Sequence, residues 1–241
     1  MSIRNSITGP SAETTVGKDS SAAVFNLPKQ LLCESSTYFE AALNNGFAET
    51  ATQKITLDDD DDHPEIFRTY AAWLFERELS QESIGEVADV EHHLFFVYIF
   101  ADKRGIRRLA NDVVTKMSSL WVTQSIDLST TVECLPLLLP GCTLYELTLD
   151  NLILASRAGT YGSDEWRAFC SHPQEIMVEL FKREQRFPDS FKHLHDCFGS
   201  ICHYHEHEDI DEEDKCIKMT ARGRNVHYGH EFLWDQVEWR W

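Results

Sequence analysis

The chain has 241 residues, of which 42% are hydrophobic and 26% charged, so it can bury a core in one or two domains and is not wholly disordered. Its 40 Asp and Glu residues outnumber its 22 Lys and Arg residues, and the formal net charge of -18 makes nucleic acids and anionic membranes unfavourable partners. The longest apolar run, at residues 94–101, falls far short of the ~20 residues that cross a bilayer, so we expect a soluble protein.

The expected compartment follows from features that the sequence lacks. Residues 1–21 hold eight Ser or Thr and no apolar run of the kind found in a signal peptide. The seven cysteines are odd in number and scattered, and no Asn-x-Ser/Thr acceptor occurs, which disfavours a secreted disulfide scaffold. We therefore expect a reducing compartment, the cytosol or the nucleus.

The first part of the chain is predicted to form a hairpin, two short helices and a further strand. Small polar residues and a Gly9-Pro10 break predict a disordered arm over residues 1–13. Pro28 sets φ for a first helical turn, and the Ser35 and Ser36 hydroxyls are candidate caps for the next helix. The expected elements are strands at residues 14–17 and 23–27, helices at 29–33 and from Ser36 to Asn45-Gly46, and a strand at 53–57.

Three longer helices are predicted next. Asp62 precedes His63-Pro64-Glu65, an N-cap pattern with Pro in the first turn, and apolar residues follow at helical spacing. Residues 87–103 are apolar on nearly all sides and are expected to form the central core helix, closed by Gly105. The third helix carries the clearest apolar stripe, which consists of Ile106, Leu109, Ala110, Val113, Val114 and Met117.

Beyond residue 118 the pattern is weaker but stays helical. We expect a short buried segment at residues 135–139 and amphipathic helices at 144–155 and 176–181, the last opened by the capping-box pattern Ser171-x-x-Gln174. Seven of the nine residues 206–214 are acidic, which predicts a solvated, mobile segment. The last eight residues, 234–241, hold three of the six tryptophans and are interpreted either as docked on the helical part or as an exposed partner-binding motif.

Several patterns that suggest chemistry fail when their spacing is tested. Gly17-Lys18 lacks the spacing and the hydroxyl of a phosphate loop, and neither His-Glu pair is followed by the second His of a metalloprotease helix. The aspartates at 58, 60 and 62 fit the first three ligand positions of a calcium loop, but His63 stands where Gly is needed and Thr69 where Glu is needed. We therefore interpret residues 58–62 as an exposed loop whose last Asp caps the next helix, and we expect no enzymatic activity.

One cluster remains a candidate metal site. Cys202, His205, His207 and Cys216 supply two thiolates and two imidazoles, which is a set that suits tetrahedral zinc, and Cys197 or His203 are alternative ligands. Such a zinc would be structural, because four protein ligands leave no position open for a substrate water. The alternative interpretation is an acidic, His-rich tail that binds no metal.

The stretch from Phe25 to about Met117 resembles a BTB/POZ domain of the kind found in filamentous fungi. The matching positions are Phe25, Lys29, Leu32, Ser35, Tyr38-Phe39, Phe47-x-Glu49, Ile55-x-Leu57, the Asp-rich run, Phe67, Tyr70, Trp73-Leu74-Phe75, Leu94, Val97-Tyr98 and Ala101-Asp102-Lys103. The Pro140-Gly141 step and the Tyr204-His205-Glu206-His207 tail ending near Cys216 also look like the C-terminal extensions of those proteins.

The resemblance implies an α+β fold, a small mixed sheet flanked by a helical cluster, followed by an α-helical extension. It divides the chain into a disordered arm (1–13), a BTB/POZ domain (14–118), a helical extension (119–200) and an acidic, His/Cys-rich and Trp-rich tail (201–241). Two features depart from the family and weigh against its usual dimer interface: Pro28 stands where His is usual, and the first strand is short.

The resemblance also implies assembly without catalysis. BTB domains pair with themselves or bind a cullin scaffold as substrate adaptors in ubiquitin ligation. By similarity, the cullin-facing surface would comprise the loop after Phe75 and the helices of residues 97–117. Our leading hypothesis is a protein-interaction module that forms a homodimer or binds a cullin; the alternative is a zinc-stabilised protein that uses the Cys/His cluster.

Overall fold

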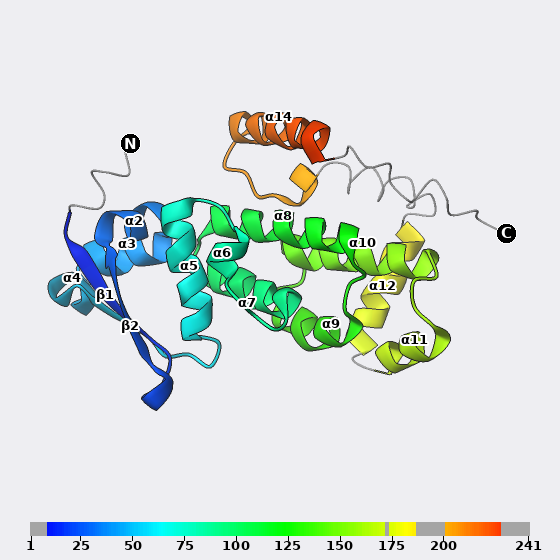
Figure 1. Cartoon of the computed structure of the whole chain (residues 1–241), viewed down its shortest axis with the longest axis horizontal. Coiled ribbons are helices and arrows are strands. Elements are labelled where there is room, and N and C mark those ends of the chain that lie inside the picture. The colour runs from blue at the N-terminus through cyan, green and yellow to red at the C-terminus, as the bar shows by residue number, and fades with distance from the viewer. Residues whose placement is uncertain (1–8, 172–173, 187–200, 228–241) are drawn as a thin grey trace.

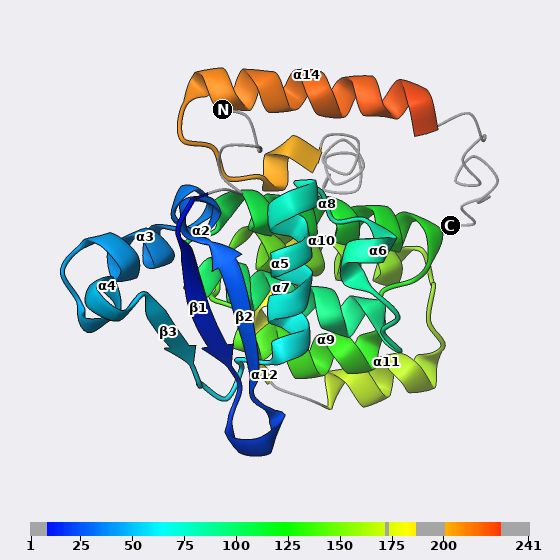
Figure 2. The same cartoon turned by 60° about the vertical axis from the view of Figure 1, so that its left-hand side comes forward.

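The computed structural model describes residues 9–171, 174–186 and 201–227. It is a mixed α+β structure that is dominated by helices. Figures 1 and 2 show the small sheet with α2, α3 and α4 at one end, the larger helices beside it, and α14 set apart from the rest. The strands are β1 Ser11–Val16, β2 Ala23–Pro28 and β3 Lys54–Leu57. The described α-helices are α2 Lys29–Ser35, α3 Thr37–Asn44, α4 Ala48–Thr52, α5 Pro64–Glu76, α6 Gln81–Ile84, α7 Val90–Lys103, α8 Arg107–Thr123, α9 Leu128–Cys134, α10 Thr143–Arg157, α11 Ser163–Cys170, α12 Gln174–Arg186 and α14 Ile210–His227, and the 3-10 turns are η1 Asp19–Ser21, η2 Leu135–Leu137 and η3 Ile201–Tyr204.

The sheet has the order β2-β1-β3, with β1 antiparallel to β2 and parallel to β3. The predicted hairpin is therefore confirmed, but its first strand begins at Ser11 and not at residue 14. A disordered arm that reaches residue 13 is wrong, because Ala12 is fully buried in the core and Glu13 pairs with Asn26. Residues 1–8 lie outside the described part.

β1 and β3 bury every second side chain, and in β2 every second side chain is shielded but only Leu27 is buried, as expected for a sheet with one face on a core. The inner face packs on α5, where the rings of Phe25 and Phe67 lie 4.7 Å apart. The outer face carries Val24, and an ion pair joins Glu13 to Lys54 at 2.7 Å. One face of the sheet is thus open to solvent.

The central position predicted for residues 87–103 is confirmed by α7, whose buried side chains face several neighbours. The helix starts at Val90 because the Asp89 carboxylate accepts the backbone N–H of His92 as an N-cap, and it ends before Gly105, which has a φ of 59°. The apolar stripe on α8 is buried as predicted.

Asp62 does not cap α5, so the interpretation of residues 58–62 as an exposed loop ending in a cap is wrong at that residue. His63 is the N-cap residue, and it makes no side-chain cap bond. The Asp62 carboxylate is buried, pairs with the Arg104 guanidinium and accepts the Asp59 backbone N–H at 3.1 Å. A full ion-pair partner satisfies this carboxylate better than a helix end does.

The boundary expected at residue 118 falls inside a helix. α8 continues to Thr123, and Trp121 beyond that boundary is buried. The predicted helix at 144–155 is found as α10, but it is buried on most sides because α8, α12 and η3 all pack on it. The segment at 135–139 is only partly buried, since Leu137 and Leu139 are exposed.

The acidic residues 206–214 are not wholly irregular, because α14 begins at Ile210. Its first turn carries Asp211, Glu212 and Glu213, where negative charge suits the positive end of the helix dipole. Of the capping box predicted at Ser171, the Ser171 residue is the C-cap of α11 and its hydroxyl donates to the Ala168 carbonyl at 2.7 Å, whereas residues 172–173 lie outside the described part. The Trp-rich residues 234–241 also lie outside it. Among the described helices, none combines the length and the apolar character that a bilayer span requires.

Candidate functional site

The C-terminal segment that carries the candidate ligands lies against α8. Figures 1 and 2 show η3 between α8 and α14. Arg107, Asn111 and Thr115 contact this segment, and they are spaced four residues apart, which places them on one face of α8. The outer face of α8 is therefore a docking surface for residues 205–212.

Two hydrogen bonds between the Asn111 side chain and the Glu206 backbone fix the middle of this segment. The Asn111 side-chain amide donates to the Glu206 carbonyl and its oxygen accepts the Glu206 N–H, both at 2.9 Å. Arg107 forms ion pairs with Glu208 at 2.8 Å and with Glu212 at 3.2 Å. Because Glu206 is held by its backbone, the positions of His205 and His207 on either side of it are set as well.

The segment is also anchored on α10. The Tyr204 ring is buried, and its hydroxyl donates to Asp150 Oδ2 at 2.5 Å. The other Asp150 oxygen accepts from Arg183 of α12, which also pairs with Glu146. This chain of partners satisfies a buried carboxylate and ties η3 to two helices.

Cys202, His207 and Cys216 converge in the structure, with one potential ligand atom of each lying within 4.8 Å of the others. Cys202 Sγ lies 3.3 Å from His207 Nε2. His205 joins the group from the other side, since its Nδ1 lies 3.1 Å from Cys216 Sγ. Three of the four residues proposed from the sequence therefore converge, and the fourth, His205, contacts one of them.

Neither alternative ligand, His203 or Cys197, is found in the cluster of described residues. His203 is exposed and stacks edge-on against Tyr204 with the ring centres 5.1 Å apart. Cys197 lies outside the described residues.

Burial favours the uncharged forms of these side chains. Burial raises the pKa of the Cys202 thiol to about 12, and it also raises the pKa of the Cys216 thiol. Burial, with a smaller contribution from His207, lowers the pKa of His205 to about 4. His205 is therefore a neutral imidazole at physiological pH, which is the form that binds metals.

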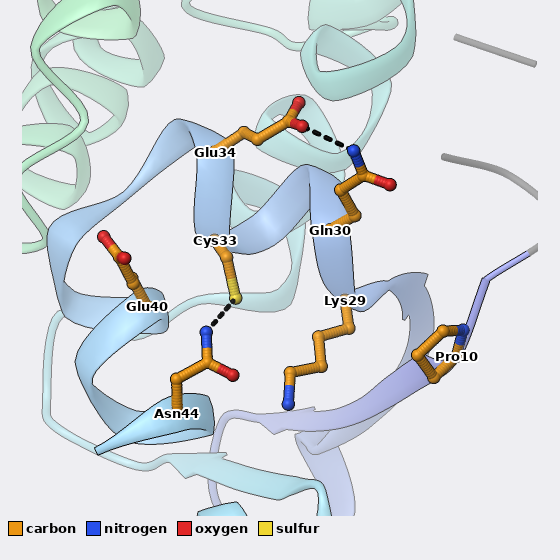
Figure 3. A pocket seen from close by; sticks show the side chains of 7 residues that line it. All are labelled: Pro10, Lys29, Gln30, Cys33, Glu34, Glu40 and Asn44. Atoms are coloured by element: carbon orange, nitrogen blue, oxygen red, sulfur yellow. Dashed lines mark hydrogen bonds between the residues drawn. The ribbon is translucent and has the colours of Figure 1, made fainter. Parts of the chain in front are cut away.

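The surface hollow in Figure 3 lies between α2 and α3 beside the start of β1. Lys29 Nζ donates to the Leu43 carbonyl at 3.0 Å, and Asn44 Nδ2 donates to Cys33 Sγ at 3.5 Å. Burial raises the pKa of the Cys33 thiol, which works against an activated nucleophile. The hollow is open to solvent, and its groups are engaged in holding α2 to α3.

The surface expected to face a partner is partly covered. Trp73 is buried in the core and donates to Asp112 of α8 at 2.7 Å, whereas Phe75 stays exposed at the end of α5. Within residues 97–117, the face of α8 around Asn111 is occupied by η3 and its following loop. The scan against protein-family models and the search of curated proteins gave no match to this chain.

Proposed function

We propose that this chain is a non-enzymatic protein-interaction protein of the BTB/POZ type, with a second copy of itself and a cullin scaffold as its partners. A small mixed sheet packed on a helical cluster supports the proposal. So do the positions that carry the resemblance, most of which are core residues. The buried ones include Leu32, Phe39, Phe67, Tyr70, Trp73, Leu74, Leu94, Val97 and Tyr98.

The observation that carries the proposal is the exposure of the remaining aromatic residues of the pattern. Among described residues up to 118, the aromatic side chains that rank as exposed large hydrophobics are Tyr38, Phe47 and Phe75, and all three belong to the matching positions. Phe47 is 59% exposed, and the other two are 40% exposed. A fold does not require aromatic rings in solvent, whereas protein interfaces use them as anchors.

The structure leaves two surfaces open for partners. Among the described residues no further strand pairs with the outer edge of β2, and such an edge can extend a sheet into a second copy. The end of α5 at Phe75 and the corner at Phe47 remain uncovered for a different protein. The described cysteines are all free thiols, which supports a reducing compartment, the cytosol or the nucleus.

The proposal is tested by light scattering of the purified full-length chain and by pull-down with a purified cullin scaffold. We expect a dimer or a cullin complex, and we expect Phe47→Ala or Phe75→Ala to weaken cullin binding by at least about 10-fold, as loss of an interface anchor does. Val24→Ala is the matched control for cullin binding, because Val24 is also 59% exposed but is not part of the pattern. A chain that stays monomeric and ignores the cullin would overturn the proposal.

A further inference from the structure

The described side chains of α14, at residues 210–218, give it little of the apolar attachment that usually holds a surface helix to a protein. Among residues 210–218, whose side chains the structure describes, none is buried, and Ile210 is 76% exposed. Only Glu212 and Cys216 are partly shielded from solvent, and they lie one helical turn apart. Glu212 pairs with Arg107, and Cys216 contacts His205 one turn further along the same face of α14. A helix of this composition needs more than one ion pair to stay in place.

Two sulfur-to-nitrogen distances in the Cys/His cluster suit neighbouring ligands of one metal ion. Zinc bonds of about 2.3 Å to sulfur and about 2.0 Å to nitrogen place neighbouring S and N ligands about 3.5 Å apart. The two observed S to N distances are 3.3 Å for Cys202 and His207 and 3.1 Å for His205 and Cys216. Cys202, His207 and Cys216 already have one ligand atom each within 4.8 Å of the others, and His205 reaches this group through Cys216, so binding of the ion would draw the His205 ring in as the fourth ligand.

A hydrogen-bond relay orients His205 for ligation. The Thr115 hydroxyl donates its single proton to the Asn111 carbonyl at 3.1 Å. The same hydroxyl oxygen lies 2.8 Å from His205 Nε2 and therefore accepts a hydrogen bond from the Nε2–H group. The neutral ring then carries its lone pair on Nδ1, the atom that faces Cys216. Metal-bound histidines are typically held in this way by an oxygen on the second nitrogen.

We propose that Cys202, His205, His207 and Cys216 bind one Zn²⁺ ion and that this ion fastens α14 to η3 and the residues after it, which lie against α8. On binding, the two thiols release two protons, and the resulting thiolates balance the charge of the ion. A set of two sulfurs and two nitrogens in tetrahedral positions selects zinc over magnesium or calcium. The site is structural, since all four positions are filled by side chains. This inference goes beyond the proposed interaction function and does not depend on it.

The first experiment is metal analysis of the full-length chain purified from zinc-supplemented cells, followed by Co²⁺ substitution. We expect one zinc per chain and the absorption of tetrahedral Co²⁺ with thiolate ligands. Cys202→Ser and Cys216→Ser should each abolish both signals. Cys170→Ser and His203→Asn are the matched controls, because both side chains are exposed and outside the cluster, and both variants should retain the metal.

The second experiment uses Thr115→Val, which leaves every ligand in place but removes the acceptor for His205. It should weaken zinc binding by about 10- to 100-fold while the chain stays folded. Hydrogen exchange of the full-length chain should show that a chelator deprotects α14 and η3 selectively. The proposal is overturned by fewer than about one zinc per ten chains with no Co²⁺ spectrum, by a Cys202–Cys216 disulfide in the purified protein, or by metal retention in the Cys202→Ser and Cys216→Ser variants.

Discussion

Glu91 is a buried carboxyl group in the first turn of α7 whose ionisation opposes folding. It accepts the Asp127 backbone N–H at 3.2 Å, yet burial, reinforced by the Asp127 and Asp89 charges, raises its pKa from 4.5 to about 7. The folded state therefore binds more protons than the unfolded state between these two values. The stabilising contribution of the protonated group is complete below pH 4.5 and is lost as the pH rises through about 7.

This pKa shift predicts the behaviour of Glu91→Gln. At pH 8 the free energy of unfolding of the variant should exceed that of the parent by up to about 3 kcal/mol, because Gln stays uncharged. The difference should vanish near pH 4.5, where Glu91 is protonated in the parent. Urea unfolding followed over this pH range measures it. Glu86→Gln, which removes an exposed carboxyl, is the control and should track the parent. A Glu91→Gln curve parallel to the parent at all pH values contradicts the prediction.

The ion pair between Asp62 and Arg104 could not be predicted from the local sequence. The sequence shows a run of five aspartates before a helix, and nothing local separates the last from the others. The structure pairs Asp62 with Arg104, 42 residues later, and places the guanidinium 4.3 Å from the centre of the Phe100 ring. A contact of this range is set by the packing of α7, which Arg104 follows, against α5, which Asp62 precedes. The Cys/His cluster was predictable because its four residues lie within 15 positions of one another.

At the scale of elements, a helix could be predicted where it carried a repeated apolar pattern or a clear start signal, such as Pro28 before α2 and Ser36 before α3. The three long helices α5, α7 and α8 have apolar patterns that repeat over several turns. The helices missed, α4, α6, α9 and α11, have four to eight residues each, too few for such a pattern. α14 was misread because its acidic residues suit a helix start as well as a solvated loop.

The junction of α7 and α8 depends on Gly105, and Gly105→Ala tests this. Its φ is 59°, and an added Cβ would lie 2.3 Å from Thr37 Oγ1. We expect the free energy of unfolding to fall by about 1–2 kcal/mol because alanine is strained in the left-handed region, and by about 1–3 kcal/mol more because its Cβ clashes with Thr37. Gly46→Ala is a matched control, because Gly46 also has a positive φ but open space around its Cβ position.

The outcome can be measured as the free energy of urea unfolding. Gly46→Ala should lose only the stability that backbone strain takes away. Combining Gly105→Ala with Thr37→Ala should restore much of the stability lost to the clash. Equal losses for Gly105→Ala and Gly46→Ala would show that the contact with Thr37 does not constrain the junction.

At the scale of the whole molecule, one hydrophobic cluster extends from Ala12 in β1 to Tyr204 in η3. It includes side chains from both sides of the expected boundary at residue 118, and α8 passes through that boundary without a break. A chain with one continuous core should unfold as one unit. The fold class was predictable from the order of elements, but this continuity depends on how α10 packs on α8, which no local pattern reveals.

Two matched core substitutions test whether the chain unfolds as one unit. Leu74 in α5 and Leu147 in α10 are both fully buried, and they lie on opposite sides of residue 118. Leu74→Ala and Leu147→Ala should each lower the free energy of unfolding by about 2–5 kcal/mol. Both should lower the midpoint temperature of the same calorimetric transition by about 5–15 °C. Leu139→Ala, at an exposed leucine, should leave the midpoint temperature of that transition unchanged. If each core variant instead moved a different transition, the residues on either side of 118 would fold as separate domains, and the shared core would not be what couples them.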